Sequence, residues 1–365
     1  MQFGLNESQV ILRDSAREFF AGECPPSMLR RLIETDAVHD RAVWSQLAAQ
    51  GYTGVNFDEA YGGVGLGLVE LVLLMEEAGR VLLPGPFFST VALAGAVIDA
   101  CGSDDQKRRL LTPICRGEAC ATLALLESDA SWDPAAVRMN GSGGQLSGVK
   151  LFVTDAAEAQ VLVVVTCDGV HVVDTISTGV RIEAMAGIDP TRRVYAVTFE
   201  NTSTEPLAHP DRLRHGLDVA TTALVAEMVG GMQRTLDLTI EYAKTRKQFG
   251  KPIGSFQAVQ HQCADMYLET ESARSAAYYA AWALQERAPD AATAVAIAKL
   301  YASDAARAVG NRGIQVHGGM GFTWESDLHL YYRRAKASET MLGDATFHRE
   351  RLARLVIDAG AVRES

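Results

Sequence analysis

A block of short, β-rich runs lies between two long stretches of helical periodicity in this sequence. Residues 118 to about 208 contain runs such as Val161–Thr166, separated by glycines, and this pattern predicts a small antiparallel sheet or barrel. Residues 1–117 and 209–365 have apolar residues at helical spacing instead. Because strands and helices do not alternate, the order excludes the βαβ units of a dinucleotide-binding fold. We therefore expect a mostly α-helical α+β chain with three domains, 1–117, 118–208 and 209–365.

Local signals mark the ends of several expected helices. Asn6 with Gln9, and Ser103 with Gln106, have the spacing of capping boxes at helix N-termini. Three long alanine-containing stretches without proline are expected to be helices in the last domain: Leu217–Thr245, Gln257–Glu286 and Ala291–Val316. Long helices joined by short loops are typical of a helical bundle.

Composition and charge exclude several classes of function. The 365 residues carry a formal net charge of −11, so neither nucleic acid nor an anionic membrane is an expected partner. The most apolar stretch, residues 68–88, contains four charged residues and is not expected to span a bilayer. The six cysteines lack metal-ligand spacing, so we expect reduced thiols and no metal site. The start, Met1-Gln2-Phe3-Gly4, has no basic region before an apolar run, so we expect no signal peptide and a cytoplasmic protein.

A basic segment is conspicuous in so acidic a chain. Four cations occur between Lys244 and Lys251, around Gln248-Phe249-Gly250 and at the end of an expected helix. Cations at a helix C-terminus complement the helix dipole, which accounts for the charge. The dipole does not account for the adjoining Gln-Phe-Gly. Arg246 and Gln248 beside a flexible glycine offer the cationic fork and the neutral donors that a pyrophosphate requires.

Two glycine-rich segments are further candidates for close approach of a ligand. Residues 62–67 are flanked by expected helices and do not follow a strand, so we interpret them as a turn and not as a nucleotide loop. The segment Gln315-Val-His-Gly318-Gly319-Met-Gly321-Phe322 follows an expected helix. Its adjacent glycines let the backbone approach a ligand, although a simple helix-terminating turn is the alternative.

The sequence resembles the acyl-CoA dehydrogenase family over nearly its whole length. The N-terminal third matches in LRDSAREFF, WSQLAAQGYTGV, YGGVGLG and MEEAGRVLLPGP, and the C-terminal third in YAKTRKQFGKPIGSFQAVQHQCADM and QVHGGMGF. The resemblance implies a helical domain, then an antiparallel β-barrel, then a four-helix bundle. It also implies FAD shared between two subunits, an acyl-CoA substrate and an electron-transfer flavoprotein as acceptor.

The resemblance also implies cofactor-binding positions. In the family, the R-x-Q-F motif and the Gln-x-x-Gly-Gly turn bind the ADP half of the flavin that is seated mainly in the neighbouring subunit. The corresponding residues here are Arg246, Gln248, Phe249, Gln315, Gly318 and Gly319. A Trp-x-Thr of the middle domain normally covers the flavin ring. Phe152 and Thr154 stand at those positions and keep an aromatic face and a hydroxyl.

Two departures from the family concern the chemistry. Residues Leu126–Trp132 replace the Thr-Glu-Pro-Gly-x-Gly-Ser-Asp loop that contacts flavin and thioester, so this chain's own flavin pocket departs from that of the family. Family members remove the α-proton of the substrate with a Glu at one of two positions. Leu342 and Ala220 occupy these positions here. Because neither side chain accepts a proton, we expect no catalytic residue in this chain.

Three hypotheses remain open at this point. In the first, the chain is one subunit of a heteromeric acyl-CoA dehydrogenase, and a homologous partner supplies the Glu. Sequences with a Leu-Gly-Asp-Ala stretch resemble such subunits of actinobacterial enzymes. Several of those enzymes act on sterol side-chain CoA thioesters. In the second, a homo-oligomer is self-sufficient and uses another base, such as Asp344 or Glu339, although Asp344 also has the position of a helix cap. In the third, the chain is a non-catalytic assembly module.

Overall fold

The N-terminal part of the chain is helical, as predicted. The computed structural model describes residues 4–35, 37 and 39–358, so part of the N-terminal segment used for the signal-peptide prediction lies outside the described residues. The helices are α1 (Glu7–Glu23), α2 (Pro26–Glu34), α3 (Arg41–Ala49), α4 (Leu68–Arg80), α5 (Ala96–Cys101) and α6 (Asp104–Cys115), with a π-helical segment η3 (Phe88–Gly95) before α5. Both predicted capping boxes are confirmed, at Asn6–Gln9 and Ser103–Gln106. The glycine-rich residues 62–67 form the loop before α4, as predicted.

The middle part consists of two separate sheets. The strands are β1 (Ala121–Ala124), β2 (Gln145–Thr154), β3 (Val161–Thr166), β4 (Gly169–Asp174), β5 (Val180–Met185), β6 (Val194–Ser203) and β7 (Glu205–Pro206). One sheet has the order β1-β3-β4-β7 and the other β2-β6-β5. The predicted antiparallel barrel is therefore wrong in two respects, because the sheets do not close and β1 pairs with β3 in parallel. The parallel pair arises because the chain leaves β1 for the other sheet and returns in the same direction.

The C-terminal part is again helical. It contains α7 (Leu213–Thr245), α8 (Gln257–Gln285), α9 (Ala291–His317), α10 (Leu328–Thr340) and α11 (Ala345–Ala353). A short hairpin of β8 (Lys247–Gln248) and β9 (Lys251–Pro252) joins α7 to α8. The helices α7, α8 and α9 contact one another, and α10 contacts α7 and α9. The count of four helices in this bundle stays a prediction. Within the described ranges, no helix is long and apolar enough to cross a membrane.

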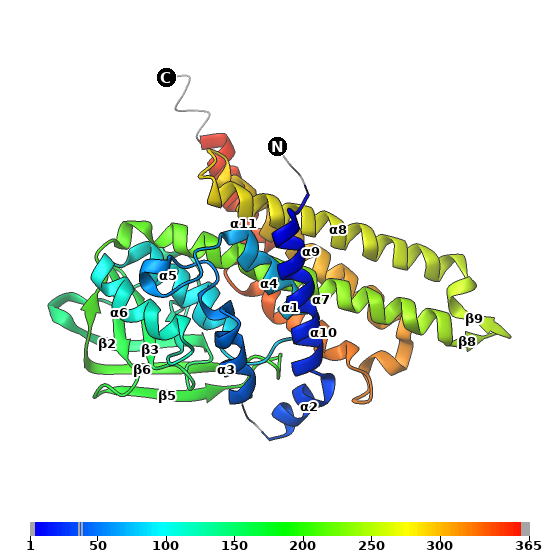
Figure 1. The fold of residues 1–365 in the computed structure, drawn as a ribbon, viewed down its shortest axis with the longest axis horizontal. Coiled ribbons are helices and arrows are strands. Elements are labelled where there is room, and N and C mark those ends of the chain that lie inside the picture. The colour runs from blue at the N-terminus through cyan, green and yellow to red at the C-terminus, as the bar shows by residue number, and fades with distance from the viewer. Residues whose placement is uncertain (1–3, 36, 38, 359–365) are drawn as a thin grey trace.

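Helix α7 connects the two ends of the molecule. Its 33 residues extend over about 50 Å at the helical rise of 1.5 Å per residue. In Figure 1 the sheets lie near its N-terminus, whereas the β8–β9 hairpin projects from the opposite end of the bundle. Helix α4 crosses the middle of α7 at close range, and the absence of a side chain at Gly230 allows this approach. A Cβ atom added there would lie only 1.9 Å from the carbonyl oxygen of Glu76 on α4. This crossing fixes the N-terminal helices against the bundle.

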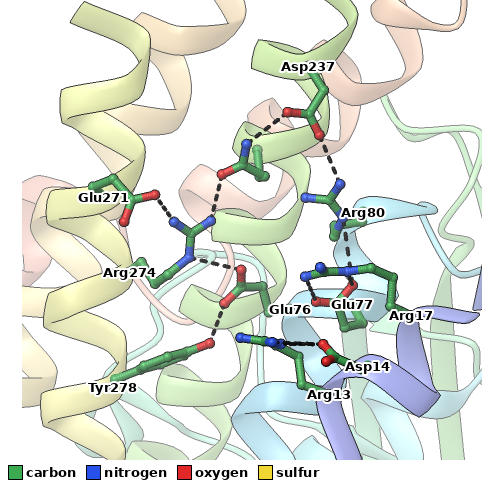
Figure 2. A network of polar contacts seen from close by, with 11 residues as sticks. Arg13, Asp14, Arg17, Glu76, Glu77, Arg80, Asp237, Glu271, Arg274 and Tyr278 are labelled. Atoms are coloured by element: carbon green, nitrogen blue, oxygen red, sulfur yellow. Dashed lines mark hydrogen bonds and ion pairs between the residues drawn. The ribbon is translucent and has the colours of Figure 1, made fainter. Parts of the chain in front are cut away.

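A polar network strengthens the same junction (Figure 2). Arg17 of α1 donates two hydrogen bonds to the buried carboxylate of Glu77, at 2.6 and 3.0 Å. Arg274 of α8 donates to the other buried carboxylate of α4, Glu76, at 2.9 Å, and the hydroxyl of Tyr278 also donates to it at 2.7 Å. Because each buried charge has a charged, hydrogen-bonded partner, the network is compatible with burial.

Candidate cofactor and substrate sites

The hairpin end of the bundle gathers one group of predicted cofactor-binding residues. Arg246 is the C-cap of α7, and its backbone N–H donates to the carbonyl of Tyr242 at 2.8 Å. The ring of Tyr242 stacks on His317, the last residue of α9, at 4.3 Å between centroids. Since Gly318 follows His317 directly, the R-x-Q-F segment and the Gln-x-x-Gly-Gly turn lie at the same end of the bundle.

The side chains of this group point away from the body of the chain. Phe249 is 91% exposed at the tip of the hairpin and has a positive φ of 52°. Arg246, Gln248 and Gln315 are exposed as well. A Cβ atom at Gly318, whose φ is 60°, would meet nothing within 4 Å. A surface of exposed cations, amides and open backbone can bind a phosphate-containing group that a second molecule presents.

The second group of predicted residues lines a cavity between the sheets and the C-terminal helices. The cavity has a volume of about 610 Å³, which lies within the usual range for small-molecule sites. Phe152 and Thr154 both line it, as the prediction for the flavin ring requires. The other lining residues are mainly apolar and include Trp132, Ile188, Met341 and Phe347.

The cavity suits a flat aromatic ring but not a pyrophosphate. Aromatic side chains of Trp132, Phe152 and Phe347 contribute to its walls. Its lining includes a single cation, Arg192, and both oxygens of Glu227 already accept from that guanidinium at 2.6 Å. The cavity is lined by residues of β2, α10 and α11, whereas the exposed cations lie around the β8–β9 hairpin. Figure 1 draws β2 and the β8–β9 hairpin at opposite ends of α7. The residues predicted for the flavin ring and those predicted for the ADP half therefore lie on separate surfaces of this chain.

The replaced loop 126–132 forms part of this cavity and is anchored by an ion pair between the buried Lys150 and the partly buried Glu127. The ammonium group of Lys150, on β2, donates to Glu127 at 2.8 Å and to the carbonyl of Leu125 at 3.0 Å. Glu127 also accepts from the backbone of Arg138 and Met139, at 2.9 Å each. Partial burial would raise the pKa of Glu127, but Lys150 and these hydrogen bonds hold it below its usual value. The loop is thus fixed in place although its sequence departs from that of the family.

The two expected base positions are apolar and enclosed. Leu342 is 4% exposed and has a positive φ of 58°, and Ala220 is fully buried on α7. Asp344 lines the cavity, but its carboxylate accepts from the backbone N–H of Phe347 at 2.8 Å as the N-cap of α11. Glu339 forms ion pairs with Arg307 and Lys336. The described residues therefore place no unpaired carboxylate at either expected position.

A buried group of charges adjoins the cavity and was not predicted. Glu227, two helical turns after Ala220 on the same face of α7, is 3% exposed and accepts from both Arg192 and Arg334. Arg334 of α10 also forms an ion pair with Asp189, at 2.5 Å. Burial would raise the pKa of Glu227, but the two guanidiniums outweigh it and hold the pKa below its usual value. A carboxylate so held is not suited to remove a proton.

A second unpredicted group is the fully buried Lys299 on α9. Its ammonium nitrogen donates to the hydroxyl of Ser303 and to the carbonyls of Ser338, Glu339 and Gly343, at 2.9 to 3.2 Å. Burial lowers the pKa of Lys299 to about 7, against the attraction of Asp344 and Glu339. The sequence signal for both Lys299 and Glu227 is a single charge within an apolar helical run.

The described part of the chain contains no cluster of three or more His, Cys, Asp or Glu side chains that could hold a metal ion.

Comparison with known proteins gives consistent matches. A model described as the N-terminal domain of acyl-CoA dehydrogenase matches residues 6–118, and one described as its C-terminal domain matches residues 211–357. Acyl-CoA dehydrogenase IpdE2 of Mycobacterium tuberculosis is 33% identical over 337 residues, which cover 92% of this chain and 93% of that protein.

Solved structures are similar over nearly the full length. A variant of the Tcur3481-Tcur3483 steroid ACAD has a TM-score of 0.90 at 33% identity, covering 97% of this chain and 99% of that chain. The ChsE4-ChsE5 complex from Mycobacterium tuberculosis has a TM-score of 0.89 at 28% identity, covering 97% of this chain and 98% of that chain. Solved structures with this fold also include FAD complexes.

Proposed function

The chain belongs to the acyl-CoA dehydrogenase family, and from this premise we propose that it is the base-lacking subunit of a heteromeric enzyme. The family assigns it to the flavin-dependent oxidoreductases of fatty acid or steroid degradation, with FAD as the cofactor. A homologous partner would supply the Glu that removes the α-proton of the acyl-CoA. The observation that carries the proposal is the contrast between two enclosed apolar base positions, Leu342 and Ala220, and an exposed cationic hairpin.

The proposed contribution of this chain to catalysis is binding and orientation. Arg246 and Gln248 would bind the pyrophosphate of a flavin seated in the partner, and Gln315 with the backbone at Gly318 and Gly319 would hold its ADP half. Phe249 would bury its exposed ring against the partner. When bound, FAD supplies the acceptor for the hydride that leaves Cβ of the acyl group. Precise orientation of this kind contributes to rate because it replaces an improbable encounter by a fixed geometry.

The same comparison supports the substrate class and the partners that we propose. We propose an acyl-CoA with a bulky acyl group, such as a sterol side chain, because a similar solved structure carries the name steroid ACAD. Two similar solved structures join two differently named chains, which supports a homologous subunit as the partner. An electron-transfer flavoprotein would accept the electrons.

We also propose that the chain consists of three domains, residues 1–117, 118–208 and 209–365.

One observation favours a second candidate, a self-sufficient homo-oligomer. Asp344 is exposed and lines the cavity beside Phe152 and Thr154. One oxygen of this carboxylate accepts from the N–H of Phe347 at 2.8 Å and caps α11, which fixes the side chain two positions past the expected base position. We rank this candidate second because the cap accounts for Asp344 without a catalytic role.

Copurification with measurement of flavin distinguishes the candidates. The chain is purified alone and after coexpression with a homologous acyl-CoA dehydrogenase chain from its genomic neighbourhood, and FAD is measured by absorbance. The proposal predicts no FAD in the chain alone and one FAD for each pair of unlike chains in the complex. A yellow, active homo-oligomer would support the second candidate instead. A complex without FAD would contradict both.

A further inference from the structure

The two helices that carry the predicted ADP-binding residues approach each other closely before they end. A Cβ atom at Gly313 of α9 would lie 2.9 Å from the methyl group of Thr235 on α7, so the absence of a side chain at this glycine allows the contact. Both helices then continue, α7 to Thr245 and α9 to His317. The predicted ADP-binding residues adjoin these two ends, so their relative position depends on how the ends are held.

A pair of stacked rings holds the two ends together. The rings of Tyr242 and His317 have centroids 4.3 Å apart and planes inclined by 20°. Nδ1 of His317 lies 2.9 Å from the carbonyl oxygen of Gly313, one helical turn earlier. Burial lowers the pKa of His317, so the ring is neutral at pH 7 and its Nδ1–H donates to that carbonyl. The imidazole is thus fixed along one edge by its own helix and on one face by α7.

Each ring directly adjoins one of the two predicted ADP-binding segments. On α7, the backbone N–H of Arg246 donates to the carbonyl of Tyr242 at 2.8 Å, which closes the last turn of the helix. On α9, Gly318 follows His317 with φ 60° and ψ −139°, a conformation that favours glycine and ends the helix. A displacement of either ring therefore moves the segment beside it.

We propose that Tyr242 and His317 are positioning residues that set the distance between the R-x-Q-F segment and the Gln-x-x-Gly-Gly turn. The inference rests on the proposed function, because the ligand concerned is the ADP half of an FAD seated in the partner. Arg246 and Gln315 come from different helices and must contact that ligand at the same time. Spacing that is correct before binding reduces the ordering that binding requires. The pair acts through the segments beside it and not by touching the cofactor.

The test measures the dissociation constant of FAD in the complex of this chain with a coexpressed homologous subunit. The flavin is removed, and binding is followed by flavin fluorescence during titration. His317→Ala and Tyr242→Ala each remove one ring. We expect each to weaken binding about tenfold, because displacement of one segment loses a charge-assisted or amide hydrogen bond to the ligand.

The double variant shows whether the two rings act as one unit. Because each alanine variant already breaks the stack, the double variant should bind FAD no more than about twofold more weakly than either single variant. Independent contributions would multiply to a weakening of about a hundredfold, which would reject the pair. If an alanine variant does not assemble, Leu at the same position takes its place, since it also lacks a flat ring.

Conservative substitutions separate positioning from direct contact with the ligand. His317→Phe and Tyr242→Phe keep a flat ring at each position, so both should bind FAD within about threefold of the wild type. A loss in His317→Phe as large as that in His317→Ala would show that the imidazole nitrogens matter and not the stack. That result would overturn the proposal.

A matched control on the same helix tests for an effect of stability alone. Val309 is fully buried on α9, about 12 Å along the helix axis from His317. Val309→Ala removes apolar contacts and should lower the midpoint of thermal unfolding, which is measured for every variant, but it should retain FAD affinity. Equal weakening of FAD binding in Val309→Ala and His317→Ala would reject the positioning role.

Arg246→Ala distinguishes failure of this inference from failure of the proposed function. If Arg246→Ala weakens FAD binding and the alanine variants of the stack do not, the chain keeps its proposed role and the positioning pair is rejected. If none of these variants weakens binding, the proposed function fails and the inference fails with it.

Discussion

The ammonium nitrogen of Lys299 lies 2.9 Å from the carbonyl oxygen of Gly343. In the same loop, the carbonyl oxygen of Leu342 lies 2.9 Å from a ring nitrogen of His348. Burial lowers the pKa of His348 to about 4, so its ring is neutral at pH 7 and donates a hydrogen to that carbonyl. The buried side chains of Lys299 and His348 therefore hold the loop in which family members carry their base, although Leu342 itself cannot accept a proton.

Replacement of Lys299 by Met should destabilise the fold. The substitution leaves three buried carbonyl oxygens without their donor, and unsatisfied buried groups cost about 1–3 kcal/mol each, partly offset because a buried charge is removed. We expect a loss of about 2–4 kcal/mol in the free energy of unfolding, measured with urea. Lys336→Met is the control, since Lys336 is partly exposed and forms an ion pair with Glu339 at 3.2 Å, with its ammonium 6.0 Å from the ring centroid of Tyr332, and it should cost less than about 1 kcal/mol. Equal losses in the two variants would reject the role of Lys299.

The role of Asp344 can be separated by two substitutions. Asp344→Asn keeps an oxygen that accepts from the N–H of Phe347, so the cap of α11 and the stability of the fold should be retained. Turnover of the assembled enzyme should then change by less than about twofold. Asp344→Ala removes the cap and should cost about 1 kcal/mol of stability. Loss of a general base lowers rates by about 10²–10⁴-fold. A fall of that size in Asp344→Asn with FAD still bound would make Asp344 the base.

The buried Asp155 should give a measurable dependence of stability on pH. Burial raises its pKa to about 6, although the hydroxyl of Ser89 donates to it at 2.7 Å and Arg192 and Arg334 oppose the shift. The folded state thus binds an extra proton between about pH 4 and pH 6, and the stabilisation that this proton gives is lost as the pH rises through 6. Asp155→Asn stays neutral throughout.

The stability of Asp155→Asn relative to wild type should therefore increase from pH 4 to pH 7, by up to about 3 kcal/mol for a shift of two units. Taking the difference between variant and wild type removes the opposite contribution of His348, whose lowered pKa costs stability as the pH falls. Thermal unfolding at several pH values measures the difference. A difference that is independent of pH would show that Asp155 is ionised in both states over this range.

Features that depend on neighbouring residues could be predicted from the sequence. The cap of Asn6 and Gln9 and the C-terminal end of α7 at Thr245 were both predicted correctly, because spacing and composition decide them locally. Phe152 and Thr154 both line the cavity, but the alternation of an extended strand does not account for this, because β2 is irregular between Lys150 and Val153 and Phe152 has a positive φ of 53°. The pairing of β1 with β3 was not predicted, because it depends on how strands far apart in the sequence meet.

The buried group of charges beside the cavity, made of Asp189, Arg192, Glu227 and Arg334, could not be predicted for the same reason. Asp189 and Arg334 are 145 positions apart, and Arg192 and Glu227 are 35 apart. No local spacing relates such partners. What the sequence does contain is a lone Glu227 in an apolar run, and a charge in that position requires a buried partner.

Arg246→Ala should lower the FAD content of the assembled enzyme without unfolding it. Arg246 is exposed at the end of α7, so its removal leaves the core unchanged, while a lost charge-assisted bond to phosphate reduces affinity about tenfold or more. Arg181→Ala, an exposed arginine on β5, is the matched control and should retain FAD. FAD is measured by absorbance at limiting concentration. Equal occupancy in both variants would remove Arg246 from the binding site.

The most direct test of the central claim is acyl-CoA dehydrogenation by this chain alone and with its partner. Turnover is measured with added FAD, an artificial electron acceptor and a series of acyl-CoA substrates, on protein shown by mass spectrometry to be free of any homologous chain. Leu342 and Ala220 offer no carboxylate, so we predict no turnover by the chain alone. Addition of the homologous subunit should restore turnover, and replacement of that subunit's Glu by Gln should abolish it. Sustained turnover by the isolated chain would contradict the assignment of this chain as a base-lacking subunit.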